Sequence, residues 1–141
     1  MTGQSLTTER KTTLTTLFNQ SIHRHTGGHV LAAAQAYERV LRDLPTHADV
    51  LDLYGTALFQ RGAAATGRAH VTASLKRRPV CGAAWNHLGA LDRGLRDDGP
   101  AQRAFQRSAV FGDRDETDRG LRLNRRAAAM LATLTSTAAD A

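Results

Sequence analysis

Residues 51–79 decide the fold, and they read LDLYGTALFQRGAAATGRAHVTASLKRRP. Eight positions of this stretch recur 34 residues away on one or both sides, namely those of Leu51, Tyr54, Gly55, Leu58, Gly62, Val71, Ser74 and Pro79. Forward along the chain, the position of Gly55 holds Gly89 and that of Val71 holds Phe105; backward, the position of Gly62 holds Gly28 and that of Pro79 holds Pro45. A fixed period of about 34 residues indicates an array of helix pairs.

The repeat resembles the tetratricopeptide repeat, whose pattern is W-x2-L-G-x2-Y, then A-x3-F, then P. The third copy carries Trp85, Leu88 and Gly89, followed by Ala101 and Phe105. The second copy runs from Leu51 to Pro79, and the first is recognisable from Ala33-x3-Tyr37 and Pro45. The resemblance covers about residues 14 to 113. It implies an all-α fold, a right-handed superhelical array of antiparallel helix pairs.

Several positions depart from the pattern, and the front half of the first copy matches it least. Gln20 stands where the pattern has an apolar residue, Arg24 and Asp92 stand at the tyrosine position, and Asp113 replaces the closing proline. The single tryptophan, Trp85, is expected to be largely buried between the helices of the third pair.

Small residues at fixed offsets explain how the helices can pack closely. Gly55 and Gly89 have no Cβ, and Ser21 is the next smallest choice at the same position of the first copy. The second helices carry Ala33, Gly67 and Ala101 at their own close contacts, and Tyr37, Val71 and Phe105 are expected to fill the space between pairs. Pro45 and Pro79 lack an amide hydrogen and mark helix ends.

The chain is expected to form one domain. We predict a flexible N-terminus over residues 1–9 and a single repeat domain over 10–134, followed by a disordered tail over 135–141. The domain divides into repeats at about 14–47, 48–81 and 82–113 and a capping helix at 115–134. The apolar residues of that last helix share one face, and an array of this kind needs a cap with a polar outer face.

The net charge is +6, from 19 Lys and Arg against 13 Asp and Glu. A basic balance raises nucleic acid as a partner, and four arginines of the last helix cluster: Arg119, Arg122, Arg125 and Arg126. The other arginines are spread over the helices, so we interpret the charge as a solvated surface and do not expect nucleic-acid binding.

The cysteine content and the hydropathy of the chain indicate the cellular compartment of the protein. Cys81 is the only cysteine, which suits a reducing compartment, and no apolar run long enough for a membrane span occurs. The sequence therefore predicts a cytoplasmic protein without membrane contact. Arg77 and Arg78 lie beside Cys81 and could lower its pKa, although a packing role for Cys81 is favoured over a redox role.

No catalytic constellation is evident. The acidic pairs, such as Asp97-Asp98, fall at expected helix starts, where capping and the helix dipole favour acids. His25 and His29 are separated by Gly27-Gly28 and do not share a helix face. We therefore predict a non-enzymatic chain with no metal and no cofactor.

In proteins with this repeat, partners bind in a concave groove lined by the first helix of each pair. Carried over to this chain, the resemblance gives the groove positions Phe18, Asn19, Ile22, His25, Asp49, Asp52, Thr56, Phe59, Asn86, His87 and Arg93. Phe18 and Phe59 are candidate anchors for a peptide, with packing as the equal alternative. Asp49 and Asp52 form a predicted negative patch, which suggests a peptide or helix with a basic flank.

The predicted function is a non-catalytic protein–protein interaction module of a bacterial cell, a scaffold, adaptor or chaperone. The clamp that holds the acidic end of heat-shock chaperones is absent, because its positions hold Phe18, Ile22, Leu53, Ala83 and His87. The alternative is an accessory, substrate-presenting domain associated with a bacterial transferase. The asparagine ladder of such domains is broken here, with Asn19, Leu53 and His87. Self-association also stays open.

Overall fold

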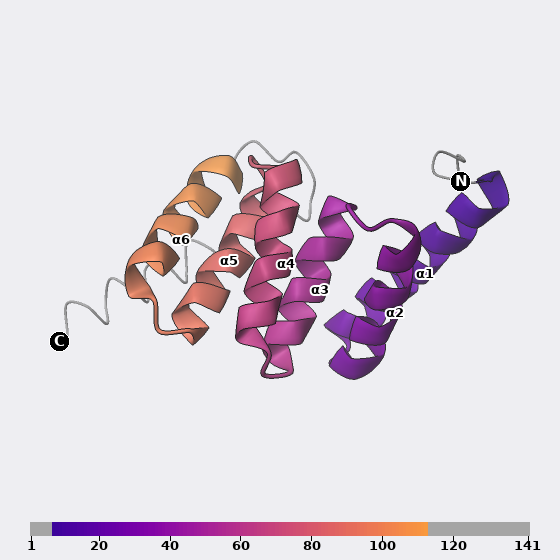
Figure 1. Ribbon diagram of the computed structural model, residues 1–141, viewed down its shortest axis with the longest axis horizontal. Coiled ribbons are helices and arrows are strands. Elements are labelled where there is room, and N and C mark those ends of the chain that lie inside the picture. Colours follow the sequence, from indigo (N-terminus) through magenta and orange to yellow (C-terminus); the bar gives the residue numbers. More distant parts are fainter. Residues whose placement is uncertain (1–6, 113–141) are drawn as a thin grey trace.

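The computed structural model describes residues 7–112, which form six α-helices in three antiparallel pairs (Figure 1). The helices are α1 (Thr8–Thr26), α2 (Val30–Asp43), α3 (Ala48–Gln60), α4 (Ala64–Arg77), α5 (Gly82–Gly94) and α6 (Asp98–Gly112). No strand occurs among the described residues, so the expected all-α repeat fold is confirmed. The predicted capping helix at 115–134 and the tail at 135–141 lie outside the described residues. At the end of the segment predicted to be flexible, residues 1–9, α1 begins at Thr8, and Thr7 caps it through a hydrogen bond from the Arg10 amide.

The turns within the pairs have the same backbone conformation at positions 34 residues apart. Gly28 and Gly62 adopt φ values of 89° and 90°, the left-handed region that glycine enters without steric cost. The third pair has Arg96 at the equivalent place, with φ of 61°. A residue with a Cβ is strained in that region. The third turn therefore has the geometry of the other two, but its backbone at Arg96 is strained.

Close approach of the two helices in a pair depends on glycine. A Cβ on Gly55 would lie 2.6 Å from the Gly67 carbonyl oxygen and 2.6 Å from Cγ2 of Val71. A Cβ on Gly89 would meet the ring of Phe105 at 2.6 Å. The expectation that small residues set the spacing of α3–α4 and α5–α6 is therefore confirmed.

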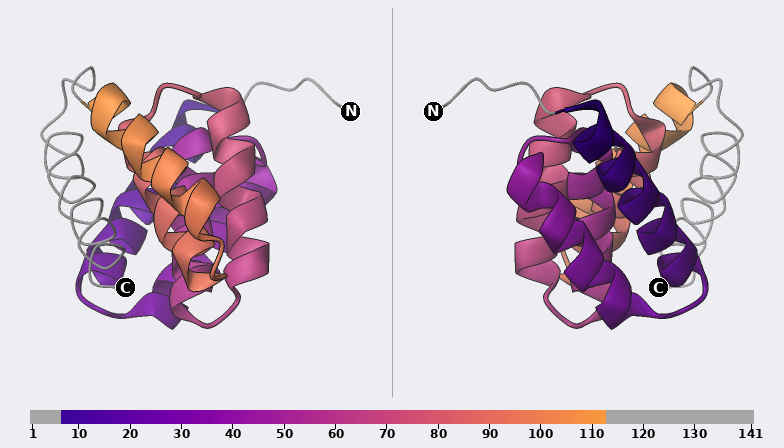
Figure 2. Two further views of the ribbon diagram at one scale, coloured as in Figure 1. Left: turned by 90° about the vertical axis from the view of Figure 1, so that its left-hand side faces the viewer. Right: turned by 90° about the vertical axis from the view of Figure 1, so that its right-hand side faces the viewer.

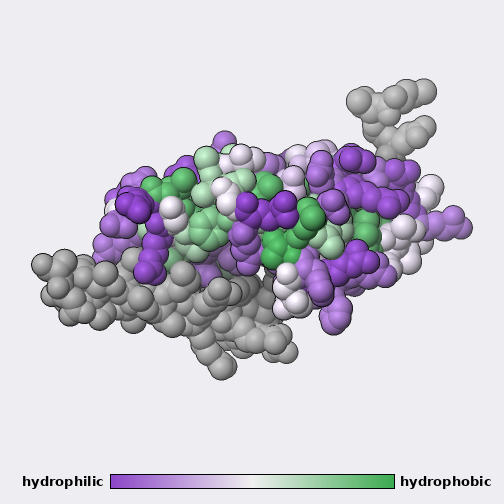
Figure 3. All heavy atoms as spheres, turned by 90° about the horizontal axis from the view of Figure 1, so that it is seen from below, coloured by the Kyte–Doolittle hydropathy of each residue, from purple (hydrophilic) through white to green (hydrophobic). Residues whose placement is uncertain are grey.

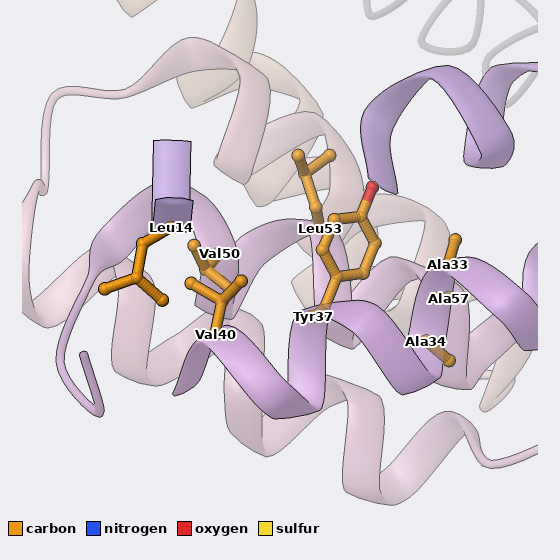
Figure 4. Close-up of a cluster of buried hydrophobic side chains, with 8 residues drawn as sticks. All are labelled: Leu14, Ala33, Ala34, Tyr37, Val40, Val50, Leu53 and Ala57. Atoms are coloured by element: carbon orange, nitrogen blue, oxygen red, sulfur yellow. The ribbon is translucent and has the colours of Figure 1, made fainter. Parts of the chain in front are cut away.

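The apolar core forms two clusters. The first joins pairs one and two, and Figure 4 shows Tyr37 and Leu53 between Leu14, Val40 and Val50 on one side and three alanines on the other. The second joins α4, α5 and α6 through Val71, Leu75, Ala84, Leu88, Leu91 and Ala104. The repeat residues Tyr37, Val71 and Phe105 have no exposed surface, as their position in the period predicts.

Trp85 differs from its prediction. It is only partly buried and packs at the margin of the second cluster. Its Nε1 donates to the carbonyl oxygen of Pro79 at 2.7 Å, and the Arg107 guanidinium lies 4.8 Å from the ring centroid. The indole N–H bonds the connection between α4 and α5, and this polar contact explains why the tryptophan lies near the surface.

The two ends of the array present different helices. Figure 2 shows α6 facing outward at one end, and α1 with α2 at the other. The three turns within pairs all lie along the lower edge of the array in Figure 1. The first helices of the pairs, α1, α3 and α5, therefore end side by side along this edge.

Candidate functional site

Two hydrogen bonds between side chains join the first helices to one another. His25 Nε2 on α1 lies 2.6 Å from Oε1 of Gln60 on α3, and Asp52 Oδ1 on α3 lies 2.7 Å from Nδ1 of His87 on α5. Each pair is 35 residues apart, one more than the repeat period. Side chains thus link α1 to α3 and α3 to α5, and we call the side of the array formed by the first helices the first-helix face.

Of the predicted negative patch, Asp52 is buried and Asp49 is partly exposed. The Asp52 side chain is 5% exposed and the His87 side chain 11%, and they bond each other. Asp49 pairs with the Arg78 guanidinium at 2.7 Å. Asp52 is therefore committed within the chain, whereas the Asp49 side chain, which is paired with Arg78, is 38% exposed.

Asn86 does not lie on the accessible face either. It is 2% exposed, and its Oδ1 has no hydrogen-bond partner among the described residues. Its position in the repeat is that of Asp52, one period later. The corresponding position of the first repeat holds Phe18, so the three copies use this place differently.

The two aromatic candidates are partly buried and contribute to packing. Phe18 makes edge contacts with the rings of Tyr37 and His47, with centroids 6.2 Å and 5.8 Å apart. Phe59 packs beside Gly94, where a Cβ would collide with its ring. Each ring keeps part of its surface exposed, so packing and partner contact are both open to it.

The remaining predicted positions retain accessible surface. Asn19 and Arg93 are exposed, and Ile22 is partly buried against the first cluster. The Thr56 hydroxyl donates to the carbonyl oxygen of Asp52 at 3.0 Å and is partly exposed. His25 is fixed on both sides, because its Nδ1 lies 3.0 Å from the Tyr37 hydroxyl in addition to the Gln60 contact.

Sequence reasoning missed two features. One is an ion pair between repeats, in which Arg68 Nε on α4 lies 2.5 Å from Oδ1 of Asp92 on α5. The other is a recess of about 660 Å³ between the start of α2 and the α3–α4 turn, lined by Gly28, His29, Val30, Leu31, Ala32, Gln35, Gln60 and Arg61. The signal for the ion pair was present, since an acid at the pattern's tyrosine position needs a partner.

The arginines beside Cys81 do not lower the pKa of its thiol overall, which fits the packing role favoured from the sequence. Burial raises the pKa of the Cys81 thiol above its ordinary value and outweighs the backbone hydrogen bond at Ala84 and the charge of Arg78, which lower it. Among residues 7–112, no group of three or more metal-ligating side chains gathers. None of the six described helices combines the length and apolarity that crossing a membrane requires.

Comparisons with known proteins identify the fold. No protein-family model matches the chain, and no curated protein matches it. Among solved structures, PcrH of Pseudomonas aeruginosa in complex with the chaperone binding region of PopD aligns over 95% of this chain and 97% of its own, with a TM-score of 0.78 and 16% identity.

Two tetratricopeptide-repeat domains are similar as well. The Sgt2 domain from Aspergillus fumigatus covers 94% of this chain and 85% of its own, with a TM-score of 0.68 and 15% identity. The first such domain of Spaghetti (RPAP3), bound to the HSP90 peptide SRMEEVD, covers 84% and 93%, with a TM-score of 0.66 and 14% identity. At these identities the likeness concerns the fold. This chain has the fold of a tetratricopeptide-repeat array.

Proposed function

We propose that the chain is a non-catalytic module that holds a peptide or helix of another protein on its first-helix face. The observation that carries this proposal is the pair of hydrogen bonds, His25–Gln60 and Asp52–His87, that joins α1, α3 and α5 into one surface. Because these bonds fix the helices before a partner arrives, binding does not have to order them. A fixed, extended surface suits a peptide of several turns or an extended strand.

Partly exposed apolar groups would supply the contact energy. Phe18, Ile22 and Phe59 lie along the face, and each keeps exposed surface while packing against an apolar cluster. Asn19, Thr56 and Arg93 offer polar contacts between them. A face of this size on three repeats suits micromolar affinity.

The structural neighbours support a binding role. PcrH is seen with the chaperone binding regions of PopD and PopB, and the RPAP3 domain with an HSP90 peptide. We further propose a bacterial, cytoplasmic setting and no catalysis, which the single cysteine and the type of neighbour support. No contact among the described residues favours the alternative of a transferase accessory domain.

Photocrosslinking tests the proposal. A photoreactive phenylalanine analogue at Asn19 or Thr56 should capture a partner in cells of the source organism, and the same analogue at Gln102, an exposed position of α6, should not. The crosslinked segment, made as a synthetic peptide, should then bind the purified chain by calorimetry. Capture from Gln102 alone would contradict the proposal.

Point variants complete the test. Thr56→Arg places a long charged side chain on the face and should weaken the synthetic peptide about tenfold, which corresponds to 1.4 kcal/mol. Gln102→Arg, which adds the same side chain on α6, should leave affinity unchanged. Equal affinity of wild type and Thr56→Arg for the peptide would place the binding site elsewhere.

A further inference from the structure

The recess beside the α1–α2 and α3–α4 turns, which we call the turn recess, is a feature of the described surface that the proposed function does not use. It joins the start of α2 to Gln60 and Arg61 at the end of α3 and holds about 660 Å³. Figure 3 views the array from the edge that carries these turns, and apolar surface is exposed there between polar side chains. Val30 of its lining packs against the first apolar cluster.

An exposed leucine gives the turn recess its apolar part. Leu31 is 50% exposed, although it is a large aliphatic residue on the first turn of α2. Val30 beside it is partly buried. An apolar side chain brought by a partner would cover Leu31 and remove this surface from water.

The charge of the turn recess is one-sided. Its lining includes Arg61 and His29 and no carboxylate. The Arg61 side chain is exposed and makes no hydrogen bond or ion pair within residues 7–112. Four of the acidic residues in the described part of the chain are already held by ion pairs: Asp43, Asp49, Asp52 and Asp92. The charge that complements the turn recess is therefore negative, and none of its lining residues supplies it.

Gln60 connects the turn recess to the first-helix face. Its Oε1 holds His25 of the face at 2.6 Å, and the same residue lines the turn recess. A partner chain that leaves the face at the end of α1 and α3 therefore reaches the turn recess directly. The two surfaces can bind consecutive parts of one chain.

We propose that the turn recess binds an acidic segment of the partner, with an apolar side chain seated on Leu31 and a carboxylate paired with Arg61. The proposal rests on the proposed function, since it concerns the same partner, but it assigns a different surface and a chemical class. It replaces the basic flank expected from the sequence, because Asp52 is buried against His87 and Asp49 is paired with Arg78. Exposed Arg–carboxylate pairs gain specificity from two parallel hydrogen bonds.

Two short probes test the turn recess apart from any native partner. The first is the acetylated tetrapeptide amide Glu-Leu-Glu-Glu, and the second is its counterpart Lys-Leu-Lys-Lys. Titrated into the full ¹⁵N-labelled chain, the acidic probe should shift the amide resonances of Leu31 and Arg61 in a saturable manner, and the basic probe should not. Equal shifts with both probes, or shifts confined to other residues, would overturn the proposal.

Variants and a matched control sharpen the result. Arg61→Glu should weaken the acidic probe at least about fivefold and admit the basic one. Leu31→Ser should weaken the acidic probe without changing its preference for sign. Arg77→Glu makes the same charge change on an exposed residue at the end of α4, toward the opposite edge of the array, and should leave the titration unchanged. Equal weakening by Arg61→Glu and Arg77→Glu would show a general charge effect and overturn the proposal.

The outcomes separate the two proposals. If the acidic probe fails while Thr56→Arg still weakens the crosslinked peptide, the turn recess proposal falls and the first-helix face stands. If the probe binds at Leu31 and Arg61 while crosslinking from Asn19 and Thr56 fails, the proposed function falls and the recess stands as an acidic-peptide site.

Discussion

Asp52 on α3 and His87 on α5 are hydrogen bonded at 2.7 Å while both side chains are almost entirely out of water. A polar group buried in this way depends on its partner, because without the partner it is left in the interior with no hydrogen bond to replace those it made to water. The pair therefore holds two repeats together, and it does not present a charge to a ligand. This assigns Asp52 to stability, where the sequence had suggested partner binding.

Asp52→Ala should consequently destabilise the chain. It leaves His87 without its acceptor, and the loss should be about 1–3 kcal/mol in the free energy of unfolding. Urea unfolding of Asp52→Ala, His87→Ala and the double variant gives the coupling energy, expected at about 0.5–3 kcal/mol. Additive single effects would mean that the two side chains do not depend on each other.

Gly67→Ala tests the close approach of α3 and α4. Alanine is the better helix former by about 1 kcal/mol, so propensity alone predicts stabilisation. A Cβ at Gly67 would collide with the backbone oxygen of Gly55, which cannot move away as a flexible side chain could. We expect a net loss of about 1–3 kcal/mol. Gly99→Ala is the control, since its Cβ would only reach the Arg103 guanidinium at 3.6 Å, and it should leave the melting temperature unchanged or higher.

Arg96→Gly should stabilise the third turn. Arg96 sits at φ of 61° where the equivalent turns have Gly28 and Gly62, and relief of that strain should raise the unfolding free energy by about 0.5–1 kcal/mol. Arg93→Gly removes the same side chain from the last turn of α5 and should instead lower it by about 1 kcal/mol. Thermal melts of the two variants should therefore move in opposite directions; a shared decrease would contradict the assignment of strain to Arg96.

Cys81 should be a slow thiol. Burial is the largest cause of its raised pKa, so at neutral pH the reactive thiolate is scarcer than in a free cysteine. Its alkylation by iodoacetamide should continue to accelerate as the pH passes the ordinary value of 9.0. The same chain in urea should follow the profile of free cysteine. A native profile that levels off below pH 9.0 would show that the arginines lower the pKa after all.

The sequence predicted the features that repeat and missed those that join one repeat to the next. The 34-residue period predicted the turns at Gly28 and Gly62 and the helix ends near Pro45 and Pro79. These residues determine the local structure through their own backbone and need no particular partner. The contacts of Asp52 and Asp92 depend on side chains 35 and 24 residues away. No repeat pattern encodes such a partner, so Asp52 was interpreted as a ligand-binding acid and Asp92 as a departure from the pattern at the tyrosine position.

Arg68→Ala tests the contact that makes Asp92 compatible with its position. Asp92 is almost fully buried where the repeat pattern has tyrosine, and Arg68 Nε on the preceding helix, with a side chain 43% exposed, reaches it at 2.5 Å. Removal of Arg68 leaves a buried carboxylate without its cation, and we expect the unfolding free energy to fall by about 2 kcal/mol or more.

Arg10→Ala breaks the exposed pair with Asp43, in which both side chains are in contact with water, and should cost no more than about 1 kcal/mol. Arg68→Ala combined with Asp92→Tyr restores the residue of the repeat pattern and should recover part of the loss in urea unfolding. If Arg68→Ala is no more harmful than Arg10→Ala, solvent screens the Asp92 carboxylate and the pair does not hold α4 to α5.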